Sequence, residues 1–242
     1  MRKIDYDKRS EWDEFVSEDT LFIQNIIKKL NARTVLEIPC SNGRNLNVIS
    51  NIVDYAIFGD INKQMVDVVK KRISMERKRN CTALVLDLCD LSILPVYASI
   101  DLILITQQSF QLLNHEQAKK TLLNIRKSGV KYIIIDIYDF LSQSVDLPIY
   151  LNNDIFFVDA NMTNWVRKSS LIPGEGGFVY LRHDYFSKDV SYTTTLTLKN
   201  YSRKEIVALC KQCGFVIDDI FTTYNMTFND NQGRTIVLLN NK

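Results

Sequence analysis

The sequence predicts an α/β fold: a doubly wound, mostly parallel sheet with an antiparallel β insertion. Short, continuously apolar strands alternate with amphipathic helices over the first 140 residues, as expected for a parallel sheet covered by helices on both faces. From residue 154 to 200 the pattern changes to alternating, β-rich runs around Gly174, Gly176 and Gly177. Such a pattern is typical of antiparallel strands joined by a turn.

The first part of the chain repeats the order strand, loop, helix. The expected strands are residues 34–38, 55–60, 82–86, 100–105 and 132–137. Helices are expected over 19–30 with Asp19 as N-cap, from Leu46, after Asn62, and after Asn114, where Gln117 completes a capping box. This alternation predicts successive βαβ units.

The last part of the chain resumes the helix and strand pattern. Ser202 and Glu205 form a capping box for a helix that ends at Gly214, and strands follow from Phe215 and over 235–239. We expect a single domain over residues 1–242, in which residues 141–200 form a β-rich insertion laid over the active site.

Composition narrows the function classes. With 46% hydrophobic and 24% charged residues and a net charge of +2, the chain is globular and has no long basic block for nucleic acid or a membrane. The acidic N-terminus and short apolar runs predict a cytoplasmic protein. Five scattered cysteines predict free thiols, and the pair Cys210 and Cys213 is expected to be structural, with no metal.

Polar residues gather just after the predicted strands, where open parallel sheets bind their ligands. Glu37 begins the segment EIPCSNG after the first strand, Asp60 ends the second, Asp87 follows the third and Thr106 follows the fourth. A carboxylate at the end of the second strand can accept both hydroxyls of a ribose, and Gly43 allows a ligand to approach the first loop closely.

In these segments the chain resembles the class I S-adenosylmethionine-dependent methyltransferases, in particular their small-molecule branch. The matching segments are VLEIPCSNGR (35–44), IFGDINKQMVDVVKKR (57–72), LVLDLCDL (84–91), IDLILITQQSFQLL (100–113) and YSRKEIVALCKQCGFVI (201–217). Their order, rather than any single match, makes the resemblance specific. It implies a Rossmann-like fold and S-adenosylmethionine as cofactor.

The resemblance also implies roles for individual residues. The methionine end of the cofactor would contact Glu37 and the loop residues Pro39, Cys40, Ser41 and Gly43. The remaining cofactor contacts would be Asp60 on the ribose, Ile61 and Met65 near the adenine, Asp87 and Leu88 on the adenine edge, Thr106, and Trp12 folding over the cofactor.

The glycine loop departs from the family pattern, because Pro39 and Ser41 stand where glycines are common. A left-handed Ser41 would cost about 1–2 kcal/mol, which weakens cofactor binding without abolishing it. A nicotinamide enzyme is the main alternative cofactor class. However, PCSNGR offers one glycine and lacks the Pro39 amide, and Glu37 would repel a pyrophosphate while suiting the amino group of S-adenosylmethionine.

For the reaction itself, we predict methyl transfer to nitrogen or oxygen of a small molecule. His183, in the insertion, is the candidate base. The acceptor pocket would be lined by Gln107, Phe110, Tyr138, Arg182 and Tyr185. An RNA or protein methyltransferase, supported only by the basic stretch 70–79, and a non-catalytic partner subunit remain alternatives, as does a homodimer.

Overall fold

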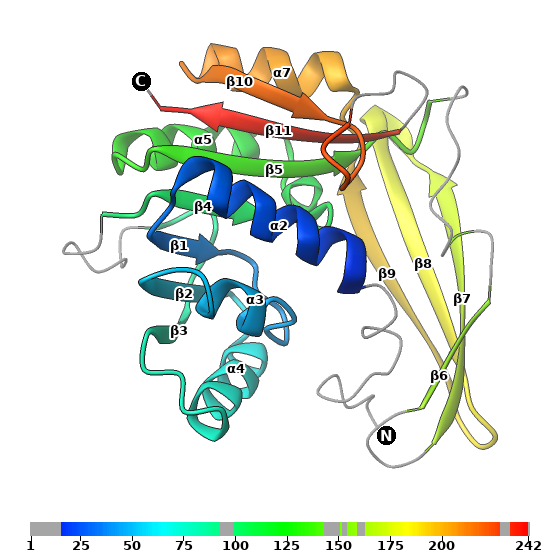
Figure 1. Cartoon of the computed structure of the whole chain (residues 1–242). Coiled ribbons are helices and arrows are strands. Elements are labelled where there is room, and N and C mark those ends of the chain that lie inside the picture. The colour runs from blue at the N-terminus through cyan, green and yellow to red at the C-terminus, as the bar shows by residue number, and fades with distance from the viewer. Residues whose placement is uncertain are drawn as a thin grey trace.

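The computed structural model describes residues 16–91, 99–142, 151, 154–158, 163–227 and 233–241 of the 242-residue chain. These residues form a seven-stranded sheet and a four-stranded sheet that stand beside each other (Figure 1). The larger sheet is mostly parallel and covered by helices, and the smaller one is antiparallel. The predicted fold class is therefore confirmed.

The seven-stranded sheet has the order β10-β11-β5-β4-β1-β2-β3. Its strands are β1 (Thr34–Glu37), β2 (Tyr55–Asp60), β3 (Cys81–Val85), β4 (Leu102–Ile105), β5 (Tyr132–Tyr138), β10 (Val216–Phe221) and β11 (Arg234–Asn240). Only β11 runs antiparallel to its neighbours. The chain order reverses between β1 and β4, so the loops after these two strands diverge at the same edge, which is where open sheets of this type bind ligands.

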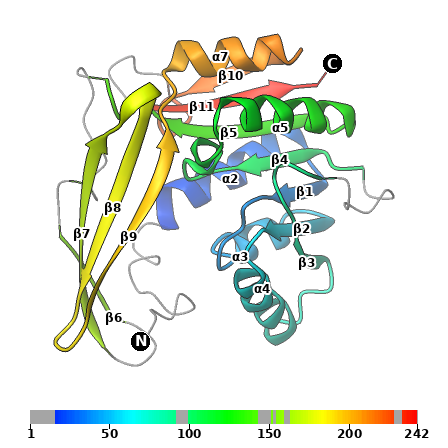
Figure 2. The same cartoon turned by 180° about the vertical axis from the view of Figure 1, so that it is seen from behind.

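Helices cover both faces of this sheet (Figures 1 and 2). One face carries α2 (Val16–Leu30), α3 (Leu46–Ser50) and α4 (Lys63–Met75), and the other carries α5 (His115–Lys127) and α7 (Arg203–Gln212). The apolar residues of α2 recur at helical spacing, so Phe22 and Ile26 both face the sheet and are almost fully buried. Each face therefore has its own core.

Three predicted helix starts are confirmed by their hydrogen bonds. Asn62 accepts a bond from the Gln64 amide, and complete capping boxes begin α5 and α7. The predicted start at Asp19 is wrong, because α2 begins at Val16 and Asp19 lies within its helical residues. Asp19 is buried in an ion pair with Arg44, and this tertiary contact explains an acid that local sequence suggested was a cap.

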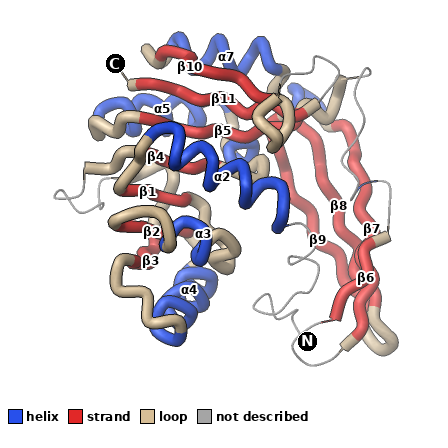
Figure 3. Tube along the Cα trace, in the orientation of Figure 1, coloured by secondary structure: helices blue, strands red, loops and turns tan. Residues whose placement is uncertain are grey.

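The antiparallel sheet consists of β6 (Ile155–Val158), β7 (Asn164–Pro173), β8 (Phe178–Phe186) and β9 (Ser191–Lys199) (Figure 3). The glycines lie between β7 and β8 as predicted, and the 3-10 turn η3 (Glu175–Gly177) contains Gly176 at a φ of +64°. This sheet stands at the edge of the larger sheet where the parallel strands end (Figure 1). Tyr138 and Phe140, at the end of β5, pack against Val179 and Leu181 of β8.

No helix within the described residues is both long and apolar enough to cross a membrane. All five cysteines are free, and Cys210 and Cys213 are buried in the core against α5 and β5. Their burial fits a structural role.

Candidate functional site

The loop after β1 is held tightly against β2 and α4. The Cys40 amide donates to the Gly59 carbonyl over 2.7 Å, and Ser41 has a φ of +49°, which is the left-handed conformation. Gly43 has a φ of +74°, and a Cβ there would lie 2.9 Å from Val69 Cγ2. Glycine is therefore required at residue 43 by both conformation and space.

Asp60 lies at the end of β2 and reaches this loop. Its Oδ2 accepts a hydrogen bond from the Ser41 amide and its Oδ1 accepts one from the Asn62 amide, each over 2.9 Å. A carboxylate has about four lone-pair positions, so Asp60 can still accept two hydroxyls. Ile61 beside it is 68% exposed, an apolar surface on which a flat ring can pack.

Glu37 ends β1 and is 3% exposed. Asn45 donates to its Oε1, whereas Oε2 has no hydrogen-bond partner among the described residues. Burial raises the pKa of Glu37 to about 7, although the Asn45 hydrogen bond and the Arg44 charge oppose the rise. A buried carboxylate oxygen without a partner fits a cationic ligand group, such as an amino group.

The third and fourth strands contribute further candidate contacts to the same edge. Asp87 is exposed and accepts the Cys89 amide over 2.8 Å, while Leu88 is 8% exposed. Thr106 is 6% exposed at the end of β4, and Met65 is partly buried on α4. These residues lie at strand ends or on the adjoining helix, as the resemblance implies.

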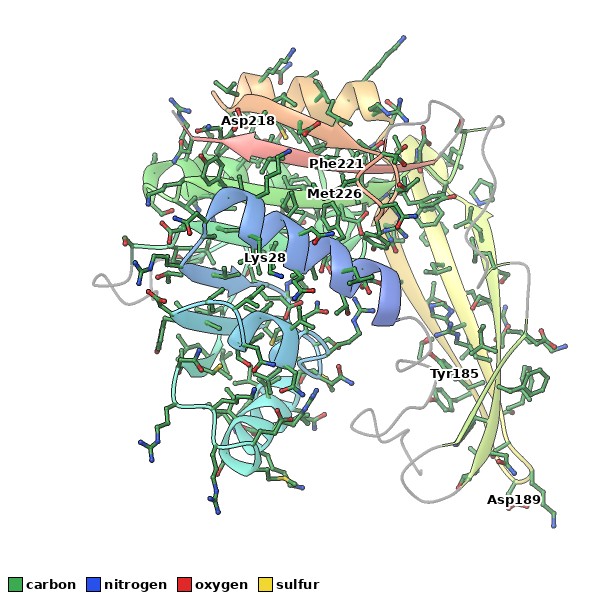
Figure 4. All side chains as sticks on the ribbon, viewed as in Figure 1. Lys28, Tyr185, Asp189, Asp218, Phe221 and Met226 are labelled. Atoms are coloured by element: carbon green, nitrogen blue, oxygen red, sulfur yellow. The ribbon has the colours of Figure 1, made fainter. Side chains whose placement is uncertain are left out.

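The candidate acceptor residues divide into two groups. Tyr138 is buried where the two sheets meet, and Tyr185 stacks on Tyr192 with ring centroids 4.8 Å apart, on the side of the antiparallel sheet toward α2 (Figure 4). His183 shares a strand face with Leu181 and Tyr185, and its Nδ1 lies 2.8 Å from Ser169 Oγ. The structure thus places His183 on the face of β8 that turns toward the larger sheet.

Two acceptor candidates are not brought to this edge. Phe110 has no exposed surface and packs against Tyr201 in the core, so its side chain lines no surface. Successive strand residues point to opposite faces, so Arg182 lies on the face of β8 opposite to His183. There it forms an ion pair with Asp184. Trp12 lies outside the described residues.

A buried polar network beside Gln107 is not among the features predicted from the sequence. The Gln107 amide donates to Asp136 Oδ2 over 3.0 Å, and its side-chain nitrogen donates to Asp19 and to Tyr224. Arg234 pairs with Asp136. An acid within the apolar run YIIIDIY was the available signal, because buried charges are rare unless they are paired.

Comparisons with known proteins agree with this geometry. Residues 35–128 match the family model described as a methyltransferase domain. No curated protein matches the sequence. Residues 35–128 include the loop after β1, Asp60, Asp87 and the end of β4.

Solved structures share the fold over nearly the whole chain. An S-adenosylmethionine-dependent methyltransferase from Clostridium acetobutylicum is 16% identical, with a TM-score of 0.74, covering 95% of this chain and 96% of that one. The sugar N-methyltransferase KedS8 from Streptoalloteichus is 12% identical, with a TM-score of 0.72 and coverage of 93% and 88%. The amino pentose methyltransferase CalS10 from Micromonospora echinaspora, solved with S-adenosylmethionine bound, is 10% identical, with a TM-score of 0.66 and coverage of 91% and 90%.

The sheet order and the helices on both faces define a Rossmann-like α/β domain with polar residues at its strand ends. Residues 35–128 are thus similar to a methyltransferase domain, and the chain shares its fold with S-adenosylmethionine-dependent methyltransferases of known structure.

Proposed function

We propose that the protein transfers a methyl group from S-adenosylmethionine to nitrogen or oxygen of a small molecule. The observation that carries the proposal is Glu37, a buried carboxylate whose Oε2 has no partner among the described residues, at the end of β1 beside the Gly43 loop. An amino acid end of the cofactor would satisfy it. A pyrophosphate there would meet an uncompensated negative charge.

The residues of the chain divide the work of binding. Glu37 would hold the amino group, Asp60 would accept the ribose hydroxyls, and Ile61 would pack against the adenine. The cofactor supplies a methyl group on a positively charged sulfur, which is already activated for displacement. The protein's task is therefore to position the acceptor in line with the methyl group and to exclude water.

The antiparallel sheet supplies the side of the site that faces the acceptor. His183 stands on the face of β8 that turns toward the larger sheet, and Tyr138 joins that sheet to β5. Two of the similar structures are named as methyltransferases of sugar nitrogen or of an amino pentose. Amino sugars, free and nucleotide-linked, are therefore the first acceptors to test.

Calorimetry with S-adenosylmethionine, its demethylated product and NAD tests the cofactor part of this proposal. We expect the first two to bind and NAD to give no heat. Transfer of labelled methyl to a panel of amino sugars, each paired with the sugar bearing a hydroxyl at that carbon, tests the acceptor part. Tight NAD binding without binding of the sulfonium would overturn the assignment.

A further inference from the structure

A second buried acid lies next to the candidate cofactor site, in the first turns of α2. Asp19 is 2% exposed, its Oδ2 pairs with Arg44 and accepts a hydrogen bond from Gln107 Nε2 over 2.9 Å. Its Oδ1 has no hydrogen-bond partner among the described residues. Leaving a buried carboxylate oxygen unsatisfied costs free energy, so this atom is suited to a ligand that donates a proton or carries a positive charge.

The contacts of Asp19 place it between the cofactor loop and the end of β4. Arg44 follows Gly43 in the loop after β1, whereas Gln107 follows β4. The loop after β1 is expected to hold the methionine end of the cofactor, and the loop after β4 is expected to line the acceptor. Asp19 therefore lies where the two reactants would meet.

The other charged groups of this region already have partners. Arg234 Nη1 lies 3.0 and 2.9 Å from the two oxygens of Asp136, and Tyr224 donates to Asp136 Oδ2 over 3.1 Å. Among the described residues of this region, Asp19 and Asp136 balance Arg44 and Arg234, and Glu37 is left for the amino group of the cofactor. The Asp19 Oδ1 atom that lacks a partner, rather than an excess of negative charge, therefore favours an acceptor that donates a proton.

Building on the proposed function, we propose that Asp19 Oδ1 receives the acceptor nitrogen and that the acceptor is an amine, which arrives as an ammonium ion. The ammonium gives one proton to Oδ1, and the freed lone pair forms the bond to the methyl carbon. The carbon–sulfur bond breaks, and its electron pair stays on sulfur as a neutral thioether. The methylated amine leaves as an ammonium ion, and Asp19 returns its proton to water.

The electrostatic surroundings support this proton transfer. Burial raises the pKa of Asp19, while the Arg44 charge and the Thr20 amide oppose the rise. Asp136 adds to the rise and Arg234 opposes it. A carboxyl group with a raised pKa is a better proton acceptor than an exposed one. An alcohol would bring no positive charge to this buried acid.

Sinefungin tests the proposal without knowledge of the acceptor, because it carries an amino group where the cofactor carries its methylated sulfur. The demethylated product has the same two ends and lacks that amino group. We expect Asp19→Asn to weaken sinefungin binding by about tenfold or more, while affinity for the demethylated product stays within about threefold. Equal weakening of both ligands, or of neither, would overturn the proposal.

Controls separate this inference from the proposed function and from misfolding. If neither ligand binds the unmodified protein, the proposed function fails. Asp101→Asn, just before β4, removes the charge of an acid that accepts an exposed hydrogen bond from the Arg33 amide, and it should leave both affinities unchanged. If Asp19→Asn does not fold, the test uses the unmodified protein. Its preference for sinefungin over the demethylated product must fall as the pH is lowered, because Asp19 then takes up a proton. Glu37, Asp136, Tyr224 and the two arginines face both ligands alike.

Discussion

Glu37, at the end of β1, is buried, has a raised pKa and has one carboxylate oxygen without a partner among the described residues. Because burial raises its pKa to about 7, the ligand-free protein holds Glu37 largely protonated below that pH. Pairing with a ligand amino group requires the carboxylate, so binding must release a proton there. S-adenosylmethionine affinity is therefore expected to fall below about pH 7, by up to about tenfold per pH unit.

Calorimetry in two buffers of different ionisation enthalpy measures both the affinity and the released proton. Glu37→Gln should bind more weakly and show little pH dependence between about pH 5.5 and 7. Glu116→Gln, at an exposed position in the first turn of α5, is the matched control. Affinity of the unmodified protein that is flat across this range would argue against Glu37 as the counter-charge.

Asp60 serves the loop as well as the expected ribose. Asp60→Ala removes the acceptor of the Ser41 amide and the charge-assisted bonds to two hydroxyls. We expect S-adenosylmethionine binding to weaken by at least about tenfold, since each such bond contributes on the order of 1.5–3 kcal/mol. Asp54→Ala, which removes an exposed ion pair with Arg33, should leave binding unchanged. Unaltered affinity of Asp60→Ala, measured by calorimetry, would leave Asp60 a turn residue.

At the scale of whole elements, the sequence predicted those features that depend on contacts between residues close together in the chain. The caps at Asn62, Asn114 and Ser202 satisfy helix amides through neighbouring residues, so they are visible in the sequence. The polar strand ends were predictable for a similar reason, because parallel strands must end at a common edge.

The sequence did not predict those features that depend on contacts between residues far apart in the chain. Asp19 resembles a cap, and its ion pair with Arg44 joins residues 25 positions apart. The Asp136 network joins three further segments, and Phe110 follows β4 yet turns into the core. Arg182 and His183 are neighbours in one strand, so their side chains point to opposite faces and cannot line the same site. The sequence of one strand does not show which of its two faces is buried.

Alternation along β8 also gives a matched pair of variants. His183→Ala should lower turnover of an acceptor found in the amino sugar panel and leave S-adenosylmethionine affinity within about threefold. Arg182→Ala changes the neighbouring residue on the opposite face and should alter neither quantity. Steady-state kinetics with calorimetry distinguishes the two outcomes. Equal effects of both variants on turnover would mean that this face has no special role.

At the scale of the whole molecule, the proposed acceptor side would depend on how firmly the two sheets are joined. Besides the apolar contacts of Tyr138, the joint contains Gln111, which has no exposed surface and lies in the turn η2 (Ser109–Leu112). Its Nε2 donates to the Tyr138 and Lys199 carbonyls over 2.9 and 3.0 Å, and its Oε1 accepts the Tyr138 amide over 2.7 Å. One side chain thus links β5, β9 and the loop after β4. By contrast, Asp189 lies at the far tip of the hairpin, away from this joint (Figure 4).

Gln111→Leu keeps most of the side-chain volume and removes all three bonds. The affected backbone groups are buried at the joint, and losing a buried partner costs about 1–3 kcal/mol for each group, so we expect a loss of a few kcal/mol in the free energy of unfolding. Gln212→Leu, at the exposed end of α7, should change it by less than about 0.5 kcal/mol. Denaturant unfolding measures both. Glu37 and Asp60 lie on β1 and β2, away from this joint, so the cofactor affinity of the folded Gln111→Leu protein should stay within about threefold. Acceptor turnover should fall, because β8 loses its fixed position. A variant as stable as the unmodified protein would mean that apolar packing alone holds the sheets together.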